Sequence, residues 1–346
     1  MQAVRYTGGP EPIAVAEVDR PRLVAGSIRI DVKAASICGS DLHYREEESE
    51  FAPSTVPVTL GHEGAGIVTE VGDGVSAFAA GDHVIVHYIS SCGHCKPCLA
   101  GRDNRCRHRD SIGHDLDGTF AGEIVVPERC AIPLDADVPF AWGSIMGCAG
   151  ATGFHALRRS GMGVGDTVAV FGAGGVGLNA IMWATFGGAG TVIAVEPVEA
   201  RRAKARALGA DVTLDPADDV PEAIADVTDG WGTDLAIECS GSPAAMAMAI
   251  DAIDGANKYE SGTVVSVGLQ ETPLEASYWG LREGSLLVSG DHTRAELHTI
   301  ADLMAAGKID CSPFVADRIG LDDVHAGFDR LASGEVVGRI VVEPTG

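Results

Sequence analysis

Residues 166–195 restrict the fold more than any other stretch, because they join three features that only a strand–turn–helix–strand unit explains. The segment reads DTVAVFGAGGVGLNAIMWATFGGAGTVIAV. Its first apolar run ends at Gly172-x-Gly174-x-x-Gly177, and a second apolar run follows about 20 residues later. In a parallel βαβ unit the first glycine permits a tight turn, the second lets backbone approach a pyrophosphate, and the third lets the helix pack on the strand. The segment therefore predicts an α/β domain that binds a dinucleotide at a helix N-terminus.

The residue after the second apolar run indicates which dinucleotide is bound. Glu196 stands there, where a carboxylate accepts hydrogen bonds from both ribose hydroxyls and repels a 2′-phosphate. This favours NAD. Arg201 and Arg202 follow closely and leave NADP as the alternative, since an arginine can bind that phosphate. The expected cofactor-binding residues in this segment are Gly172, Gly174, Gly175, Val176, Gly177 and Glu196.

Two pieces near the N-terminus carry metal-ligand residues. ICGSDLHY covers residues 37–44 and GHEGAGIVTEVGDGV covers residues 61–75. Thiolate and imidazole ligands suit zinc, and a catalytic zinc usually takes three protein ligands and leaves one position open. Cys38 and His62 are two candidates for such a site.

A second set of cysteines has the spacing C-x2-C-x2-C-x7-C. Cys92, Cys95, Cys98 and Cys106 lie in a short stretch that also contains glycine and proline. Four thiolates can close tetrahedrally on one zinc and leave no open position, which predicts a structural zinc site. An iron–sulfur cluster and a pair of disulfides are the alternatives.

The two metal-ligand pieces resemble a known family. The second piece, with Gly61, Gly66 and Gly72, is similar to the zinc signature of the medium-chain alcohol dehydrogenase superfamily. The first resembles that family's Cys-x-Ser/Thr-x-x-His segment and is closest to its polyol and threonine dehydrogenase branches. The resemblance covers nearly the whole chain.

The resemblance completes both metal sites. It implies that Cys148, four residues before Thr152-Gly153, is the third ligand of the catalytic zinc. A buried core cysteine is the alternative. It also implies that the four closely spaced cysteines form a structural zinc lobe at about residues 91–107, so two zinc ions per chain are expected. The polyol branch usually has Glu at the Cys148 position, so the sequence mixes features of two branches.

The resemblance also implies roles for eight further residues. We expect Ser40 and His43 to carry the substrate proton outward, with a surface position as the alternative for His43. Near the metal, Asp41 would orient the ligand histidine, Glu63 would lie beside the ion, and Tyr88 would line the substrate pocket. At the cofactor, Arg201 would contact the adenosine ribose, Val267 the nicotinamide amide, and Arg339 the pyrophosphate. A packed aromatic is the alternative for Tyr88, and a surface arginine for Arg339.

The expected fold class is α/β, with two domains. A GroES-like, β-rich catalytic domain would comprise residues 1–149 and 292–346, and a Rossmann doubly wound parallel sheet would comprise residues 150–291. From the resemblance we expect a homodimer or a homotetramer.

The charge balance excludes some partners. The chain has 346 residues, with 49 acidic against 25 basic residues and a net charge of −24. Such a surface repels nucleic acid and anionic membranes. No window approaches the roughly 20 apolar residues of a membrane span, and a cytoplasmic protein is expected. The acid excess with few lysines is typical of a halophile, and an acidic protein from a GC-rich genome is the alternative.

Together these features predict a zinc-dependent oxidoreductase that transfers a hydride between a small-molecule alcohol or polyol and NAD(P). A threonine- or sugar-type dehydrogenase fits the same motifs. In another class, the chain would be a zinc-free quinone-reductase-like paralogue or a non-catalytic dinucleotide sensor. The presence of Cys38, His62 and Cys148 argues against that class.

Overall fold

The structure, a computed structural model, describes residues 1–9, 12–45, 50–253, 262–269, 281 and 283–344. The chain separates into two units. Residues 1–151 and 292–346 form the first, called here the β-rich unit, and residues 152–291 form the second, called the Rossmann unit.

Three sheets make up the β-rich unit. One has the order β2-β1-β4, a second has the path β10-β6-β5-β3-β18-β17 with β9 also paired to β3, and β7 pairs with β8. The strands are β1 (Gln2–Tyr6), β2 (Ile13–Glu17), β3 (Ser27–Ser36), β4 (Val58–Thr59), β5 (Glu63–Val71), β6 (His83–Val86), β7 (Ile89–Ser90), β8 (Asp110–Ser111), β9 (Glu123–Pro127), β10 (Ala131–Pro133), β17 (Val315–Ile319) and β18 (Arg339–Val342).

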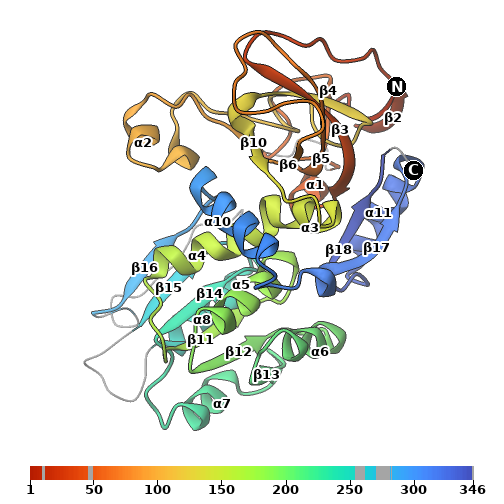
Figure 1. Ribbon diagram of the computed structural model, residues 1–346. Helices are drawn as coiled ribbons and strands as arrows, with labels where there is room; N and C mark the ends of the chain where they lie inside the picture. Colours follow the sequence, from red (N-terminus) through yellow and green to blue (C-terminus); the bar gives the residue numbers. More distant parts are fainter. Residues whose placement is uncertain (10–11, 46–49, 254–261, 270–280, 282, 345–346) are drawn as a thin grey trace. The chain divides into compact units, whose positions relative to one another are not determined.

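Short helices connect these strands. Figure 1 shows α11 beside β17 and β18, and α2 in a lobe that projects away from the sheets of the same unit. The helical segments are α1 (Gly39–His43), α2 (Lys96–Leu99), η1 (Asp103–Arg105), η2 (Glu128–Cys130), α3 (Phe140–Ile145), η3 (Met146–Gly150), α10 (Arg294–Ala305), η4 (Ser312–Phe314), η5 (Leu321–Asp323) and α11 (Val324–Ala332).

Strand β3 is the centre of this unit. It pairs with β5, β9 and β18, so most of its residues are buried although the sequence SIRIDVKAAS alternates apolar and polar residues in its first part. The glycines of β5 and the turn before it allow close packing. A Cβ on Gly66 would lie 2.1 Å from the Asp31 carbonyl oxygen, and Gly61 has φ +93°, a conformation that other residues rarely adopt. Gly66 thus lets β5 lie close to β3, and Gly61 allows the tight turn before β5.

The Rossmann unit is a six-stranded parallel sheet with the order β13-β12-β11-β14-β15-β16. Numbered within the unit, this is the order 3-2-1-4-5-6, in which the direction of winding reverses between β11 and β14. The strands are β11 (Thr167–Phe171), β12 (Thr191–Val195), β13 (Val212–Leu214), β14 (Leu235–Glu238), β15 (Thr263–Ser266) and β16 (Ser285–Val288). The expected α/β class and doubly wound sheet are confirmed.

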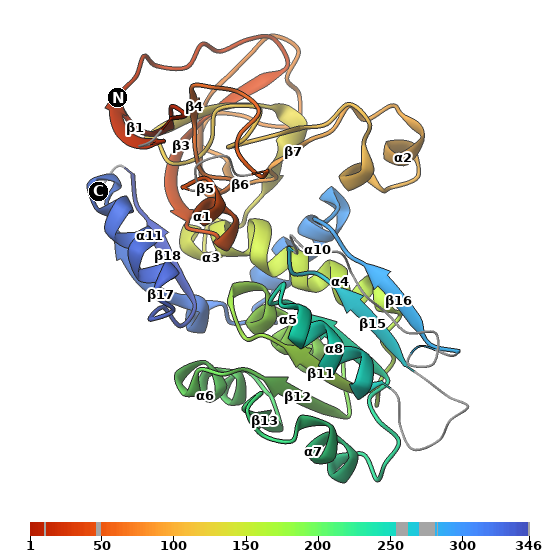
Figure 2. The same ribbon diagram turned by 180° about the vertical axis from the view of Figure 1, so that it is seen from behind.

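Helices cover the strands of this sheet (Figures 1 and 2). They are α4 (Ala151–Ser160), which begins at the boundary with the β-rich unit, α5 (Gly175–Phe186), α6 (Glu199–Ala207), α7 (Val220–Val227) and α8 (Pro243–Ala252). Strand β11 is buried and apolar after Thr167, and β14 is buried throughout and apolar up to Glu238, as expected for central strands of a parallel sheet. Among the described residues, no helix is long and apolar enough to cross a membrane.

Candidate active site and metal centres

Four side chains from distant segments meet in the interior of the β-rich unit. The ligand atoms of Cys38, His62, Glu63 and Cys148 all lie within 4.8 Å of one another, and all four residues are buried. We call this group the Cys38 cluster. Strand pairing explains half of it: the antiparallel register of β3 and β5 places Ser36 opposite Glu63, so the residues that follow β3 and precede β5 come together at one end of the sheet.

Cys148 reaches the cluster from a π-helical turn. It lies in η3, Met146–Gly150, between α3 and α4. Such turns are rare and occur often at functional sites, because the extra residue per turn redirects a side chain. A Cβ on Gly150 would lie 2.2 Å from Met146 Sδ, so glycine leaves the space for the Met146 side chain inside this turn.

Asp41 holds the imidazole of the cluster. Its Oδ1 lies 3.4 Å from His62 Nδ1, and its Oδ2 accepts a hydrogen bond from the Cys38 backbone N–H at 2.9 Å. The carboxylate is fully buried. Because Nδ1 faces Asp41, the other ring nitrogen, Nε2, is left for a metal. Burial by itself would lower the pKa of His62, but the charge and hydrogen bond of Asp41 outweigh it and raise that pKa well above its usual value.

The pKa values of the two thiols in the cluster shift in opposite directions. A hydrogen bond from Cys148 lowers the pKa of Cys38 well below its usual value, against the effect of burial and with help from the positive charge of Arg339. The same hydrogen bond, together with burial, raises the pKa of Cys148. Without a cation between them, the pair thus favours one thiolate and one thiol.

Arg339 lies directly against this cluster. Its guanidinium donates to Glu63 Oε1 at 2.9 Å, to Cys38 Sγ at 3.4 Å and to the Ile37 carbonyl oxygen at 3.0 Å. The side chain is only 4% exposed. From the sequence we expect a pyrophosphate contact for Arg339, with a surface position as the alternative. A surface position is wrong, because the β18 register carries the residue into the core, and the pyrophosphate contact stays a prediction.

The two carboxylate oxygens of Glu63 differ in their hydrogen bonding. Oε1 accepts from Arg339, whereas Oε2 is buried and has no hydrogen-bond partner among the described residues. Burial raises the pKa of Glu63 well above its usual value, although the charge of Arg339 opposes this. A buried carboxylate oxygen beside two cysteines and a histidine fits a cation at this place.

The remaining predicted residues of this site lie on the short helix α1 and in the segment between β6 and β7. Ser40 and His43 are one turn apart on α1, so they lie on the same side of that helix. The His43 ring lies 5.0 Å from the Phe51 ring. Tyr88 is buried, and its ring meets the His62 ring edge to face at 5.4 Å.

The four-cysteine lobe is a second metal centre. We use this name for residues 92–106, which include Cys92, Cys95, Cys98 and Cys106. Neighbouring sulfurs are 3.4, 3.8 and 4.0 Å apart, and no cysteine forms a disulfide. Tetrahedral bonds of about 2.3 Å to one ion separate the sulfurs by about 3.8 Å. The spacing therefore fits one ion and is too short for several irons between the thiols.

Backbone amides support a thiolate in this lobe. Hydrogen bonds from the Cys98 and Arg107 amides lower the pKa of Cys95 to about 6, although burial opposes them. Cys106 Sγ accepts from the Cys92 and His108 amides, each at 3.3 Å. A thiol that is already ionised near neutral pH binds a metal without first losing a proton.

In the Rossmann unit the glycine turn has the geometry that its sequence predicts. Gly172 has φ +88°, which forms the tight turn after β11. A Cβ on Gly177 would lie 1.8 Å from the Gly172 carbonyl oxygen, so only glycine lets α5 approach the turn. Gly174 is the N-cap of α5 and would meet nothing within 4 Å, which leaves room for a ligand at the helix N-terminus.

Glu196 follows β12 and lies behind the glycine turn. Its Oε2 accepts from the Ala173 amide at 2.7 Å, its Oε1 accepts from the Val198 amide at 3.0 Å, and Arg201 Nη1 is 3.8 Å away. Arg202 donates to the Glu196 backbone carbonyl oxygen at 2.6 Å and forms ion pairs with Glu199 and Asp215. Both arginines that leave NADP open therefore lie beside Glu196, and Arg201 is the one that faces its carboxylate.

Sequence reasoning missed a second carboxylate in this unit. Glu238, at the end of β14, accepts from the amides of Ser240 and Gly241, and the Val267 amide donates to its carbonyl oxygen at 2.8 Å. A Cβ on Gly172 would lie 2.9 Å from the Ser240 Cβ. Glu238 thus fixes the 239–241 turn against the glycine turn. Its only sequence signal is its place at a strand end.

Sequence reasoning also missed a buried polar group in the β-rich unit, formed by His87, Asp103 and His292. His292 lies 205 residues from His87, whereas Asp103 lies 16 residues from it, between two cysteines of the four-cysteine lobe. None of the three is a ligand position of a motif.

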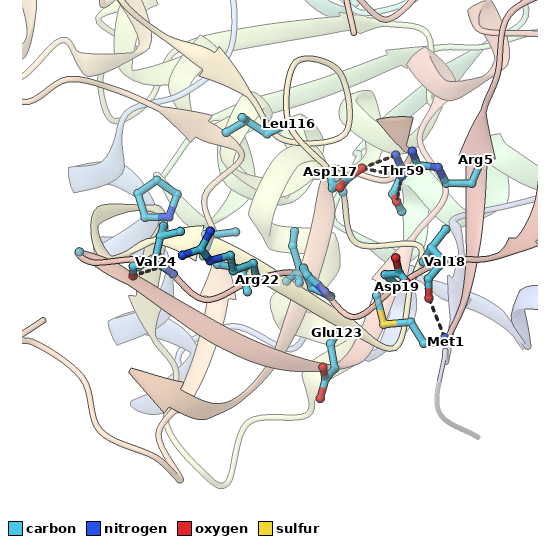
Figure 3. A pocket seen from close by; sticks show the side chains of 18 of the residues that line it. Met1, Arg5, Val18, Asp19, Arg22, Val24, Thr59, Leu116, Asp117 and Glu123 are labelled. Atoms are coloured by element: carbon cyan, nitrogen blue, oxygen red, sulfur yellow. Dashed lines mark hydrogen bonds and ion pairs between the residues drawn. The ribbon is translucent and has the colours of Figure 1, made fainter. Parts of the chain in front are cut away.

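A surface pocket of about 470 Å³ lies elsewhere in the β-rich unit (Figure 3). Figure 3 shows Arg5 bonded to Asp117 and Thr59, and the Met1 amino group bonded to the Val18 carbonyl. No residue of the Cys38 cluster lines this pocket. It is therefore not part of the candidate active site.

Comparisons with known proteins agree with both units. Residues 24–136 match the family model of the alcohol dehydrogenase GroES-like domain, and residues 175–306 match that of zinc-binding dehydrogenases. L-threonine 3-dehydrogenase of Thermococcus kodakarensis is 32% identical over 99% of this chain and 98% of its own. A Sinorhizobium meliloti 1021 structure with NADP bound has a TM-score of 0.90 and 33% identity, and covers 99% of both chains. The alcohol dehydrogenase of Aeropyrum pernix has a TM-score of 0.90 and 29% identity over 99% of this chain and 100% of its own.

The chain belongs to the zinc-type medium-chain alcohol dehydrogenase superfamily. It is an oxidoreductase of the alcohol dehydrogenase type, with the GroES-like and Rossmann folds of that superfamily.

Proposed function

We propose that this protein is a zinc-dependent, NAD-linked dehydrogenase of small alcohols or polyols that binds two zinc ions per chain. The observation that carries the proposal is the convergence of Cys38, His62 and Cys148, whose ligand atoms lie within 4.8 Å of one another in a buried site. Two thiolates and an imidazole form a ligand set of the kind found at catalytic zinc sites with an open position.

In this proposal Cys38, His62 and Cys148 hold the catalytic zinc, and the four-cysteine lobe holds the structural one. Bound zinc supplies a Lewis acid that lowers the pKa of an alcohol, and bound nicotinamide supplies the hydride acceptor. Oε2 of Glu63, which has no hydrogen-bond partner among the described residues, would also bind the cation as a transient ligand. These residues would hold the ion in a buried site.

The other side chains orient the ligands and carry the proton. Asp41 fixes the His62 ring so that Nε2 stays available. Ser40 and His43 would pass the alcohol proton outward along α1, because a hydroxyl and an imidazole one turn apart can exchange protons near neutral pH. Tyr88, packed on His62, would form a wall of the substrate pocket.

Cofactor binding is assigned to the Rossmann unit. The pyrophosphate would lie on the N-terminus of α5 at Gly174, Gly175 and Val176, where the backbone is open. Glu196 favours NAD by its charge. Because its oxygens are already bonded to backbone amides and Arg201 is beside it, NADP is the alternative that the assay must include.

A threonine-type dehydrogenase is the second candidate. It is favoured by the segment CGSDLH, which contains Cys38, Ser40 and His43, and by relatives such as the Thermococcus kodakarensis enzyme. Both candidates predict the same zinc sites and differ only in substrate.

The test combines metal analysis with a substrate panel. We expect two zinc ions per chain by elemental mass spectrometry. With NAD and NADP assayed in parallel, we expect reduction of NAD with alcohols, polyols, sugars or threonine at low and at molar salt. A single zinc ion would leave only the four-cysteine lobe and exclude a zinc-dependent active site. Two zinc ions without activity on any substrate would favour a non-catalytic dinucleotide-binding protein.

A further inference from the structure

Three buried polar side chains form a continuous hydrogen-bonded group in the β-rich unit. His87 Nε2 lies 3.2 Å from Asp103 Oδ2, and His87 Nδ1 lies 3.1 Å from His292 Nε2. The exposed fractions of His87, Asp103 and His292 are 1%, 6% and 0%. Buried polar groups are costly unless they are bonded, so this arrangement requires all three members.

One member of the group belongs to the four-cysteine lobe. Asp103 begins η1, between Cys98 and Cys106. Its two carboxylate oxygens also accept from the Arg294 amide, each at 3.2 Å, at the start of α10. Asp103 therefore connects the lobe to His87 and to the beginning of α10.

The other end of the group reaches the Cys38 cluster through Tyr88. The Tyr88 ring meets the His292 ring edge to face at 5.3 Å and the His62 ring edge to face at 5.4 Å. Tyr88 also follows His87 directly in the chain. Contacts thus run without a break from Asp103 in the lobe to His62, a candidate ligand of the other metal centre.

Asp103 remains a carboxylate in this environment. Burial alone would raise its pKa, but the hydrogen bond from His87 and the Arg294 amide outweigh burial and lower it. A buried charge with these partners holds its position firmly, and removing the charge leaves the partners unsatisfied. The place of Asp103 in turn depends on the fold of the lobe, since the short η1 lies between two of its cysteines.

We propose that Asp103, His87 and His292 couple the two metal centres: when the four-cysteine lobe holds its ion, these residues fix Tyr88 against His62 and so slow the loss of zinc from the Cys38 cluster. They are positioning residues and not catalytic ones. The inference rests on the proposed function, because it assumes a zinc ion in each centre.

The experiment follows release of zinc from the Cys38 cluster at residue resolution. The zinc-loaded protein is incubated with a chelator and N-ethylmaleimide, and peptide mass spectrometry gives the rate at which the Cys148 thiol is alkylated. The readout is independent of activity. The variants are Cys98→Ser, which opens the lobe, Asp103→Asn, which removes the charge, and the two together. Asp110→Asn is the matched control, because Asp110 is an exposed carboxylate of β8 close by in sequence.

We expect Cys98→Ser to speed Cys148 alkylation about tenfold and Asp103→Asn at least about threefold, which are the sizes of ordinary coupling energies. The double variant should be no faster than Cys98→Ser alone, because both changes break one connection. Asp110→Asn should match the unaltered protein. Should Cys98→Ser fail to fold, His87→Asn keeps all four lobe cysteines, is too short to reach Asp103, and should behave like Asp103→Asn.

Two results would overturn the coupling. One is an Asp103→Asn rate equal to that of Asp110→Asn, and the other is a double variant whose acceleration is the product of the two single ones. Zinc content separates this failure from failure of the proposed function. With two ions per chain and no coupling, only the inference is wrong, whereas a single ion per chain removes both.

Discussion

At the scale of single residues, environment and not residue type separates the cysteines. Cys130 and Cys148 are both buried, and burial raises the pKa of Cys130 to about 11, so it stays a neutral thiol. Cys148 instead shares a hydrogen bond with Cys38 inside a group of metal-ligand side chains. The difference lies in the neighbours that the fold supplies.

Substituting these two cysteines tests the assignment. We expect Cys148→Ala to lose about one zinc ion per chain and nearly all activity, because a catalytic zinc usually requires three protein ligands. Cys130→Ala, the matched control, should keep both ions and lose only stability, by about 1–2 kcal/mol for a small buried side chain. Zinc analysis and chemical denaturation measure the two effects. Unchanged zinc and full activity in Cys148→Ala would show that Cys148 is not a ligand.

At the scale of elements, two glycines of one turn have different tasks. Gly177 faces the Gly172 carbonyl oxygen at a distance that excludes a Cβ, whereas Gly174 faces open space at the N-terminus of α5. Gly177 is needed for packing between strand and helix. Gly174 is needed for the approach of a ligand.

This contrast predicts different outcomes for the two alanine variants. Gly177→Ala should destabilise the protein by about 1–3 kcal/mol through overpacking and weaken cofactor binding with it. Gly174→Ala should leave the melting temperature within about 2 °C and still raise the dissociation constant for NAD at least about tenfold, since its methyl group occupies the ligand's space. Thermal denaturation and cofactor titration distinguish the cases. Normal NAD affinity in Gly174→Ala would contradict the placement of the pyrophosphate.

At the scale of the whole molecule, the negative net charge opposes folding. The net charge is −24, and the clearest surface ion pairs, such as Arg20–Glu123 and Arg330–Asp317, contribute little individually. Repulsion among the remaining carboxylates opposes folding. Salt reduces this repulsion, because the screening length falls from about 8 Å at 0.15 M to about 3 Å at 1 M.

We therefore expect the protein to be halophilic. Its melting temperature should rise by about 5 °C or more between 0.1 and 2 M KCl, because screening relieves the repulsion of the folded state. A matched series with sucrose controls for general exclusion of solutes from the protein surface. A melting temperature that falls or stays constant with KCl would favour an ordinary acidic protein.

The sequence predicted most of the Rossmann unit, because its signals are local. The glycine turn, the flanking apolar runs and Glu196 lie within about 30 residues, and the tight turn and packing follow from backbone sterics alone. The spacing of the four lobe cysteines is local in the same way. Cys38 and His62 were weak candidates until they matched the motifs of a known family, and Cys148 was identified only through that resemblance.

The tertiary structure decided what distant segments do together. His87 and His292 are 205 residues apart, Asp103 and Arg294 are 191 apart, and Arg339 lies 276 residues from Glu63. Contacts of this kind leave no periodicity or spacing in the sequence, since they depend on strand register and on which elements pack together. By itself, the sequence determined the kinds of ligand and the local turns. Strand register and packing decided that Arg339 donates hydrogen bonds to Glu63 and Cys38, and that a lobe carboxylate joins two buried histidines.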